Sequence, residues 1–140
     1  MMIWRVTFSE LPVAAILPKP VAVKLRTRSR LLEISFDDGA HFALPFEYLR
    51  VYSPSAEVRG HGPGQETLQL GKHEVMITQV ERVGHYSVRL VFDDGHDTGL
   101  YTWAYLHELG RDREQKWQHY LRRLADLGLS YPTKIPAKAP

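Results

Sequence analysis

Cysteine is absent from this chain of 140 residues. That absence excludes disulfides, a thiol nucleophile, thiolate zinc sites and the usual self-ligated iron–sulfur clusters. Long apolar runs are also missing. The run from Leu11 to Leu17 contains Pro12 and is followed by Pro18, whereas a membrane helix needs about 20 apolar residues. Because the start also lacks the features of a signal peptide, we expect a cytoplasmic protein without a membrane partner.

Charge of one sign is scarce as well. Lys and Arg number 18 against 16 Asp and Glu, which gives a net charge of +2 with histidine neutral. So small an excess does not by itself indicate nucleic acid. The sequence also lacks a serine nucleophile elbow, a zinc-protease motif and paired catalytic carboxylates at a recognisable spacing. We therefore expect one globular domain that is not an enzyme.

Two segments of the chain resemble each other. In the first, Leu32, Ile34 and Phe36 alternate with polar residues, which is typical of a half-buried strand. An Asp-Asp-Gly turn, a second strand and a short helix after Pro45 follow, since proline is tolerated at a helix start. The same order recurs after Val88. The sequence therefore predicts two hairpin-and-helix units that share one core.

A longer helix follows the second unit. Its predicted start is Asp112, and its apolar residues recur at helical spacing up to Leu127, before Gly128. The predicted fold class is α+β, an antiparallel sheet from two similar β-hairpin-plus-short-helix units with a C-terminal α-helix. We expect an irregular extension over residues 1–20, a single domain over 21–128 and a disordered tail over 129–140.

Three groups of residues resemble a known family. They are Phe36-Asp37-Asp38-Gly39; Leu49-Arg50 with Ser53-Pro54-Ser55-Ala56-Glu57; and Phe92-Asp93-Asp94-Gly95-His96-Asp97-Thr98-Gly99 with Tyr101 and Trp103. Together they are similar to the γ-butyrobetaine hydroxylase-like N-terminal domain, over about residues 20–110. In the carnitine-pathway hydroxylases that domain resembles a zinc module with three cysteines and one histidine, and it precedes an iron- and 2-oxoglutarate-dependent catalytic domain.

That resemblance implies a limited set of properties. His96 matches the family histidine, but the cysteine positions are empty and the hydroxylase domain is missing, so hydroxylase activity is not implied. Elsewhere the same domain is fused to nucleotide-dependent iron–sulfur carriers. The resemblance therefore implies an accessory role in iron–sulfur or metal-dependent metabolism, by analogy alone.

The second acidic turn offers a candidate metal site. Asp94 and His96 lie close together in the sequence, and His41 would add a second imidazole if the two hairpins face each other. Carboxylates and imidazoles suit a divalent transition metal, here zinc or iron. The alternative is that these residues serve the turn alone.

The segment between the two units offers a candidate ligand or partner loop. Its candidate residues are Arg50, Ser53, Ser55, Glu57, Arg59 and His61. Backbone amides of a glycine-rich loop beside guanidinium groups can hold an anion. We expect a ligand or a protein partner here; the alternative is a packed loop. A homo-oligomer is a separate expectation, because in the fused relatives this module packs beside another domain.

A basic stripe precedes the first unit. Lys24, Arg26, Arg28 and Arg30 alternate with uncharged residues, so a strand would place them on one face. Such a face could contact phosphates of a nucleic acid, although charges more commonly protect a sheet edge. The leading hypothesis is a non-catalytic accessory or protein-interaction module; a metal-binding protein centred on His96 and a weak nucleic-acid binder are the alternatives.

Overall fold

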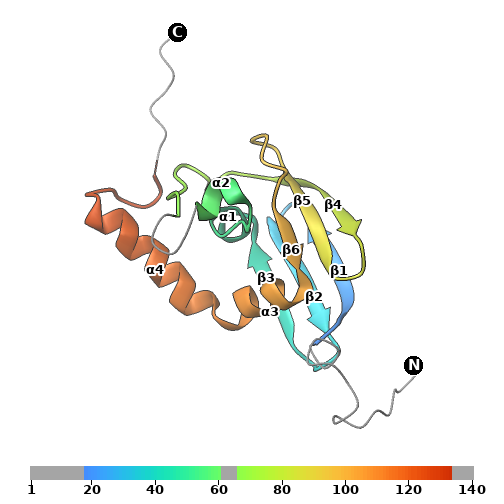
Figure 1. Ribbon diagram of the computed structural model, residues 1–140. Coiled ribbons are helices and arrows are strands. Elements are labelled where there is room, and N and C mark those ends of the chain that lie inside the picture. The colour runs from blue at the N-terminus through green and yellow to red at the C-terminus, as the bar shows by residue number, and fades with distance from the viewer. Residues whose placement is uncertain (1–17, 61–65, 134–140) are drawn as a thin grey trace.

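The computed structural model describes residues 18–60 and 66–133 (Figure 1). In these residues three strands followed by two helices occur twice, and the longest helix comes last. The elements are β1 (Pro20–Arg26), β2 (Leu31–Phe36), β3 (His41–Pro45), α1 (Phe46–Val51), α2 (Ala56–Arg59), β4 (Ile77–Val83), β5 (Ser87–Phe92), β6 (Leu100–Thr102), α3 (Trp103–Arg111) and α4 (Arg113–Asp126). The predicted α+β class is confirmed.

In each unit a third strand precedes the two strands of the predicted hairpin. The strands form two three-stranded antiparallel sheets, in the orders β1-β2-β3 and β4-β5-β6. The first pairing of each sheet is irregular at the same place. Pro20 pairs with Phe36 before the register shifts, and Ile77 pairs with Phe92 before the corresponding shift. A shared irregularity of this kind confirms that the two units are similar.

The two Asp-Asp-Gly turns also match in their hydrogen bonds. The Phe36 N–H donates to the Ala40 carbonyl at 2.8 Å, and the Phe92 N–H donates to the His96 carbonyl at 2.9 Å. The turn glycine has a φ of 88° in the first unit and 89° in the second. Glycine is required there because other residues rarely adopt positive φ.

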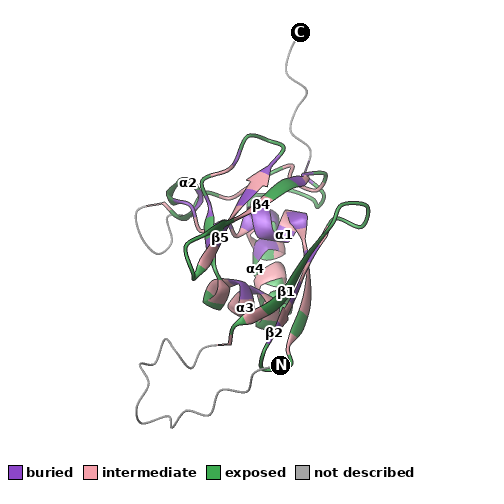
Figure 2. Cartoon of the chain, turned by 90° about the vertical axis from the view of Figure 1, so that its right-hand side faces the viewer, coloured by how far each residue is buried: buried purple, intermediate pink, exposed green. Residues whose placement is uncertain are grey.

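The core lies between the two units. Alternate residues of β2 and β5 are buried, as the predicted alternation requires, and they meet apolar residues of α1 and α3 (Figure 2). The residues at its centre with no exposed surface are Leu32, Ile34, Leu44, Leu49, Leu90, Tyr101, Leu106 and Leu109. Burial of this kind, at about 25 cal/mol per Å² of apolar surface, is the main force that joins the two units.

Helix α4 packs beside this core rather than within it. Tyr120 and Leu124 are buried against Val51. Leu127, which the spacing placed on the same face, is 64% exposed because the helix ends at Asp126. No helix in residues 18–60 or 66–133 is long and apolar enough to cross a membrane.

The predicted start of the longer helix at Asp112 is confirmed, because α4 begins at Arg113, but of the N-cap residues of α3 and α4 only Thr102 makes a side-chain capping bond. The Thr102 side chain accepts a hydrogen bond from the Tyr105 N–H at 3.0 Å, as an N-cap does. Asp112 makes no capping bond to α4. Its two carboxylate oxygens instead accept from the Arg111 side chain at 3.0 and 2.9 Å. A bidentate ion pair has therefore replaced the cap.

The basic stripe is not a strand face. β1 ends at Arg26, and Arg28 and Arg30 belong to the turn that leads into β2. Arg30 has a φ of 56°, and its carbonyl accepts from the Phe46 N–H at 3.0 Å. Arg26 forms an ion pair with Glu33 at 2.9 Å. The four cations are thus split between a strand and a turn, because the chain reverses sooner than the alternation suggested.

The segments around the domain are partly described. Residues 129–133, the start of the predicted tail, contact the domain: Thr133 is buried, and its hydroxyl accepts from the Gly71 N–H at 2.7 Å. Most of the predicted extension, residues 1–17, and the remaining tail, residues 134–140, lie outside the described residues. The predicted loop contains a short helix, α2, and His61 lies outside the described residues.

Candidate functional site

In each unit, a helix side chain contacts the acidic turn of the other unit. Arg50 at the end of α1 donates from Nε to Asp94 Oδ2 at 2.9 Å. His107, at the corresponding place in α3, lies with its Nε2 2.9 Å from Asp38 Oδ2. Asp38 and Asp94 are the second aspartates of their turns. The two contacts are therefore equivalent, and both join one unit to the other.

The contact at Asp94 is the more elaborate of the two. Asp94 Oδ2 also accepts from Lys72 Nζ at 2.7 Å, and Arg50 Nη1 donates to Gln69 Oε1 at 2.9 Å. Only 7% of Arg50 is exposed. Burial on its own raises the pKa of Asp94, but Lys72, the His96 N–H and Arg50 together outweigh it and lower that pKa. The carboxylate is held in its charged form by two cations.

His96 forms the centre of a second polar group beside Arg50. Its Nε2 lies 2.7 Å from Ser53 Oγ and 3.4 Å from Ser55 Oγ, and its Nδ1 lies 3.5 Å from Glu57 Oε2. The His96 side chain is almost completely buried. Burial, followed by the charge of Arg50, lowers the pKa of His96. We therefore treat this imidazole as neutral near pH 7.

A packing difference between the two units makes room for the polar group. In the first unit Phe42 of β3 packs against Gly110 of α3. In the second unit the corresponding residue is Gly99, and a Cβ there would lie 2.5 Å from Ser53 Oγ. Glycine thus leaves room for Ser53, which bonds His96. The contact between Ser53 and His96 is therefore polar, whereas the corresponding contact between Phe42 and Gly110 is apolar.

The order Ser53–His96–Glu57 resembles a nucleophile, base and acid in hydrolases. A nucleophile must be reachable by its substrate, yet only 1% of Ser53 is exposed. The serine hydroxyl also contacts the Ser55 N–H at 3.4 Å. The arrangement therefore orients the imidazole and positions the loop rather than presenting a reactive oxygen.

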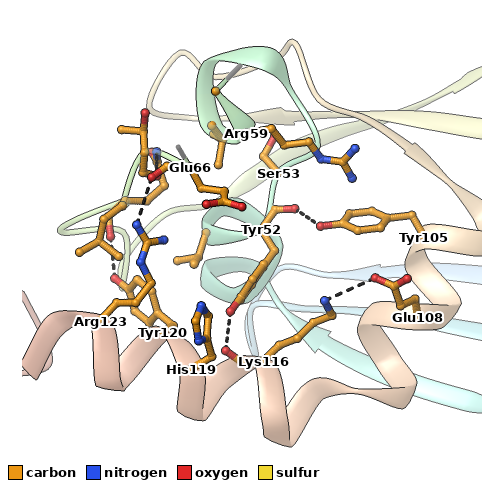
Figure 3. A pocket seen from close by; sticks show the side chains of 16 residues that line it. Tyr52, Ser53, Arg59, Glu66, Tyr105, Glu108, Lys116, His119, Tyr120 and Arg123 are labelled. Atoms are coloured by element: carbon orange, nitrogen blue, oxygen red, sulfur yellow. Dashed lines mark hydrogen bonds and ion pairs between the residues drawn. The ribbon is translucent and has the colours of Figure 1, made fainter. Parts of the chain in front are cut away.

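A cavity of about 580 Å³ lies beside this network, between α2, residues 66–69 and the helices α3 and α4 (Figure 3). Its volume is in the range of known ligand sites. Tyrosines and charged side chains alternate with a few aliphatic ones around it. The lining residues are Val51, Tyr52, Ser53, Val58, Arg59, Gly60, Glu66, Thr67, Leu68, Gln69, Tyr105, Glu108, Lys116, His119, Tyr120 and Arg123.

The tyrosines of the cavity are fixed by their hydroxyls. Tyr105 donates to the Tyr52 carbonyl at 2.6 Å, Tyr52 donates to the Lys116 carbonyl at 2.5 Å, and Tyr120 donates to the Gln69 carbonyl at 2.7 Å (Figure 3). Each bond joins two different segments of the chain. The cavity walls are thus pre-organised, which reduces the entropy lost on binding.

The structure divides the predicted loop residues into two groups. Arg50, Ser55 and Glu57 belong to the network around Asp94 and His96, whereas Arg59 lines the cavity and Ser53 belongs to both. Sequence reasoning missed the cavity residues of α4, such as Lys116 and Arg123. Their only signal was a polar face on the predicted C-terminal helix, which did not reveal what that helix packs against.

The predicted metal ligands are not gathered around one point. Asp94 is bonded to Arg50 and Lys72, and His41 Nδ1 lies 2.9 Å from Ser35 Oγ on the first sheet. Within the described ranges no group of three or more His, Asp or Glu side chains could hold a metal ion. Zinc or iron at His96 stays a prediction.

Several solved structures are similar to the chain. Two NMR solution structures are 44% and 45% identical to it, with TM-scores of 0.71 and 0.73; the matches cover 87% and 93% of this chain and 97% of each of those chains. A crystal structure from Acidithiobacillus ferrooxidans ATCC 23270, of a DUF971-family protein with unknown function, is 38% identical with a TM-score of 0.55. That match covers 65% of this chain and 91% of the other.

Among curated proteins, none matches the chain. The family comparison matches residues 23–107 to the description "Gamma-butyrobetaine hydroxylase-like, N-terminal". The match includes both Phe-Asp-Asp-Gly turns, the network around His96 and Tyr105 of the cavity, and it confirms the resemblance seen in the sequence. The chain belongs to the γ-butyrobetaine hydroxylase-like N-terminal domain family.

Proposed function

We propose that this domain is a non-catalytic accessory module that binds a protein partner at the cavity between α2, residues 66–69, α3 and α4. The observation that carries the proposal is the cavity itself, about 580 Å³ in volume and lined by fixed tyrosines and by arginines. Tyrosine and arginine are over-represented among the residues that contribute most to protein–protein binding.

A non-catalytic role is supported by how the polar residues of the neighbouring network are used. Arg50 and His96 are bonded to other side chains of the domain, and Ser53 is buried. Removing such groups would first destabilise the fold, because buried polar atoms would lose their partners. Their chemistry thus supports the shape of the loop that borders the cavity.

Other expected properties remain proposals at this stage. A role in iron–sulfur or metal-dependent metabolism rests on the family resemblance, as does a metal at His96. A cytoplasmic location and self-association are expected from the sequence alone. Nucleic-acid binding through the basic stripe stays a prediction, with only Lys24 and Arg26 of that stripe on the strand.

The test is to fill the cavity and follow the partner. Thr67 lines the cavity, and its backbone N–H donates to the Val58 carbonyl at 2.7 Å, a bond that the substitution Thr67→Trp retains. The matched control is Thr27→Trp in the exposed turn after β1. Tagged wild-type and variant chains would be isolated from native cells, and the retained proteins quantified by mass spectrometry.

We expect one stoichiometric protein to be lost with Thr67→Trp and kept with Thr27→Trp. Circular dichroism would show that both variants are folded. If the retained proteins are the same for wild type and both folded variants, binding at the cavity is excluded.

A further inference from the structure

We infer that the part of the partner that enters the cavity is an acidic segment, in which a carboxylate side chain neighbours an apolar one. This inference rests on the proposed function, since it names the chemistry of the partner at the same cavity. It follows from the charges, the rings and the aliphatic residues that line the walls.

Three cations among the described lining residues approach the cavity from two elements. Arg59 comes from α2, whereas Lys116 and Arg123 come from α4 (Figure 3). The Arg59 guanidinium lies 4.9 Å from the centre of the Tyr105 ring, and Arg123 Nη2 donates to the Glu66 carbonyl at 3.0 Å. A guanidinium carries five N–H donors, so each arginine retains the capacity to bind a carboxylate.

Two carboxylates belong to the same lining. Lys116 Nζ lies 3.4 Å from Glu108 Oε2, so that acid is already neutralised by one of the cations. The other acid is Glu66. Among the described lining residues, three cations against two carboxylates leave an excess of one positive charge. The balance favours an anionic occupant over a cationic one.

The tyrosine rings of the cavity also favour an anionic occupant over a cationic one. Aromatic faces often bind incoming cations, but here the chain's own cations occupy them: Arg59 covers Tyr105, and Lys116 Nζ lies 5.4 Å from the centre of the Tyr52 ring. An incoming ammonium group would meet these charges first. A carboxylate would instead be attracted by them.

The apolar half of the inference comes from the remaining walls. Val51, Val58 and Leu68 line the cavity together with the tyrosine rings. An apolar side chain beside the carboxylate would fill this part and bury its own surface together with that of the wall. A lone inorganic anion would leave that surface wet.

The experiment uses three capped peptides as probes: acetyl-Glu-Phe-Glu-amide, its Gln-Phe-Gln analogue and its Lys-Phe-Lys analogue. Each is titrated into the ¹⁵N-labelled full chain at low salt, and backbone amide shifts are followed by NMR. We expect the Glu peptide to shift the amides of Arg59, Thr67, Lys116 and Arg123. We expect the Gln peptide to bind roughly tenfold more weakly, and the Lys peptide more weakly again, because each exposed ion pair contributes up to about fivefold.

Two variants and a control locate the charge. Arg59→Gln and Arg123→Gln should each weaken the Glu peptide by up to about fivefold. Arg28→Gln removes the same charge from an exposed turn and should leave binding unchanged. Raising the salt should weaken wild-type binding, because screening acts on exposed charges beyond about 10 Å at 0.1 M ionic strength.

Equal binding of the Glu and Gln peptides would overturn the acidic assignment and leave the partner test with Thr67→Trp unaffected. The absence of shifts at the cavity would also overturn it. Phenylacetate is the remaining probe: if it binds at the cavity more tightly than the Glu peptide, the occupant is a small organic acid and not a segment of a protein.

Discussion

The Tyr48 hydroxyl donates a hydrogen bond to the Leu109 carbonyl at a distance of 2.6 Å. Its counterpart in the second unit, Tyr105, donates to the Tyr52 carbonyl at the same distance. Each tyrosine thus satisfies a carbonyl near the end of the other unit's helix. Carbonyls at helix ends lack intrahelical partners. The two bonds therefore join the units and also supply a donor to a carbonyl at the end of each helix.

Tyr48→Phe tests the first of these bonds. Tyr48 is 1% exposed and Leu109 is fully buried, so the substitution leaves a carbonyl without partner or water. We expect the free energy of unfolding to fall by about 1–3 kcal/mol. Tyr105 is only partly buried, so water can replace its hydroxyl and Tyr105→Phe should cost less. Urea denaturation measures both, and equal losses would contradict the difference in burial.

Local patterns in the sequence predicted much of the fold. The alternation of Leu32, Ile34 and Phe36 and the recurrence of Asp-Asp-Gly are local signals, and the structure places both as expected. β1 carried no such signal. Its residues after Pro20 are exposed, so apolar and polar positions do not need to alternate. A strand without a buried face cannot be found by its period.

The sequence predicted the polar network of the candidate site but not the cavity beside it, for a different reason. Arg50 and His96 were identified by residue type within short motifs, and the structure places them side by side in one polar region. The cavity depends instead on contacts such as the bond from Arg123 to the Glu66 carbonyl. Such contacts join segments far apart in the chain, and no local pattern encodes which face of α4 meets which loop.

The Arg50–Asp94 ion pair gives a second prediction. In a double-mutant cycle with Arg50→Met and Asp94→Asn, we expect a coupling energy of about 1–3 kcal/mol, because the pair is largely removed from water. The side-chain exposures are 9% and 21%. The matched control is Arg26 with Glu33, where Arg26 is 52% exposed.

An exposed pair of that kind should couple by no more than about 1 kcal/mol. Both cycles are measured by chemical denaturation at one pH and ionic strength. A coupling at Arg50–Asp94 no larger than at Arg26–Glu33 would show that Lys72 alone fixes Asp94.

His96 gives a prediction for pH. Its pKa is lowered from the usual 6.5 by burial and then by Arg50, so the unfolded chain takes up the proton first as the pH falls. The stabilisation is therefore complete above pH 6.5 and is lost as the pH falls toward the folded-state value. We expect the difference in unfolding free energy between wild type and His96→Gln to shrink across that window.

The measurement is a series of urea denaturations from pH 7.5 to 5, with His107→Gln as the matched control for loss of an imidazole. Asp94 does not interfere, because its pKa is lowered from 3.8 and its effect on stability appears in more acidic solution. A difference that stays constant or grows with falling pH would show that His96 is not held neutral by the fold.

Gly110 is the last test, and its expected sign depends on a second residue. It lies inside α3, where alanine would normally be favoured over glycine by about 1 kcal/mol. A Cβ at Gly110 would, however, overlap the Phe42 ring. Since overpacking costs about 1–3 kcal/mol, we expect Gly110→Ala to reduce the free energy of unfolding despite the better helix propensity.

In the background Phe42→Leu the ring is gone, and the same Gly110→Ala change should become neutral or stabilising. The comparison is made by urea denaturation of the four proteins in the cycle. Gly128→Ala is an unsuitable control because its φ of 72° would add strain of another origin. If Gly110→Ala lowers the free energy of unfolding equally with Phe42 and with Leu, the glycine is needed for a reason other than the ring. The packing of Phe42 against Gly110 would then not explain why this contact is apolar while the one at Gly99 and Ser53 is polar.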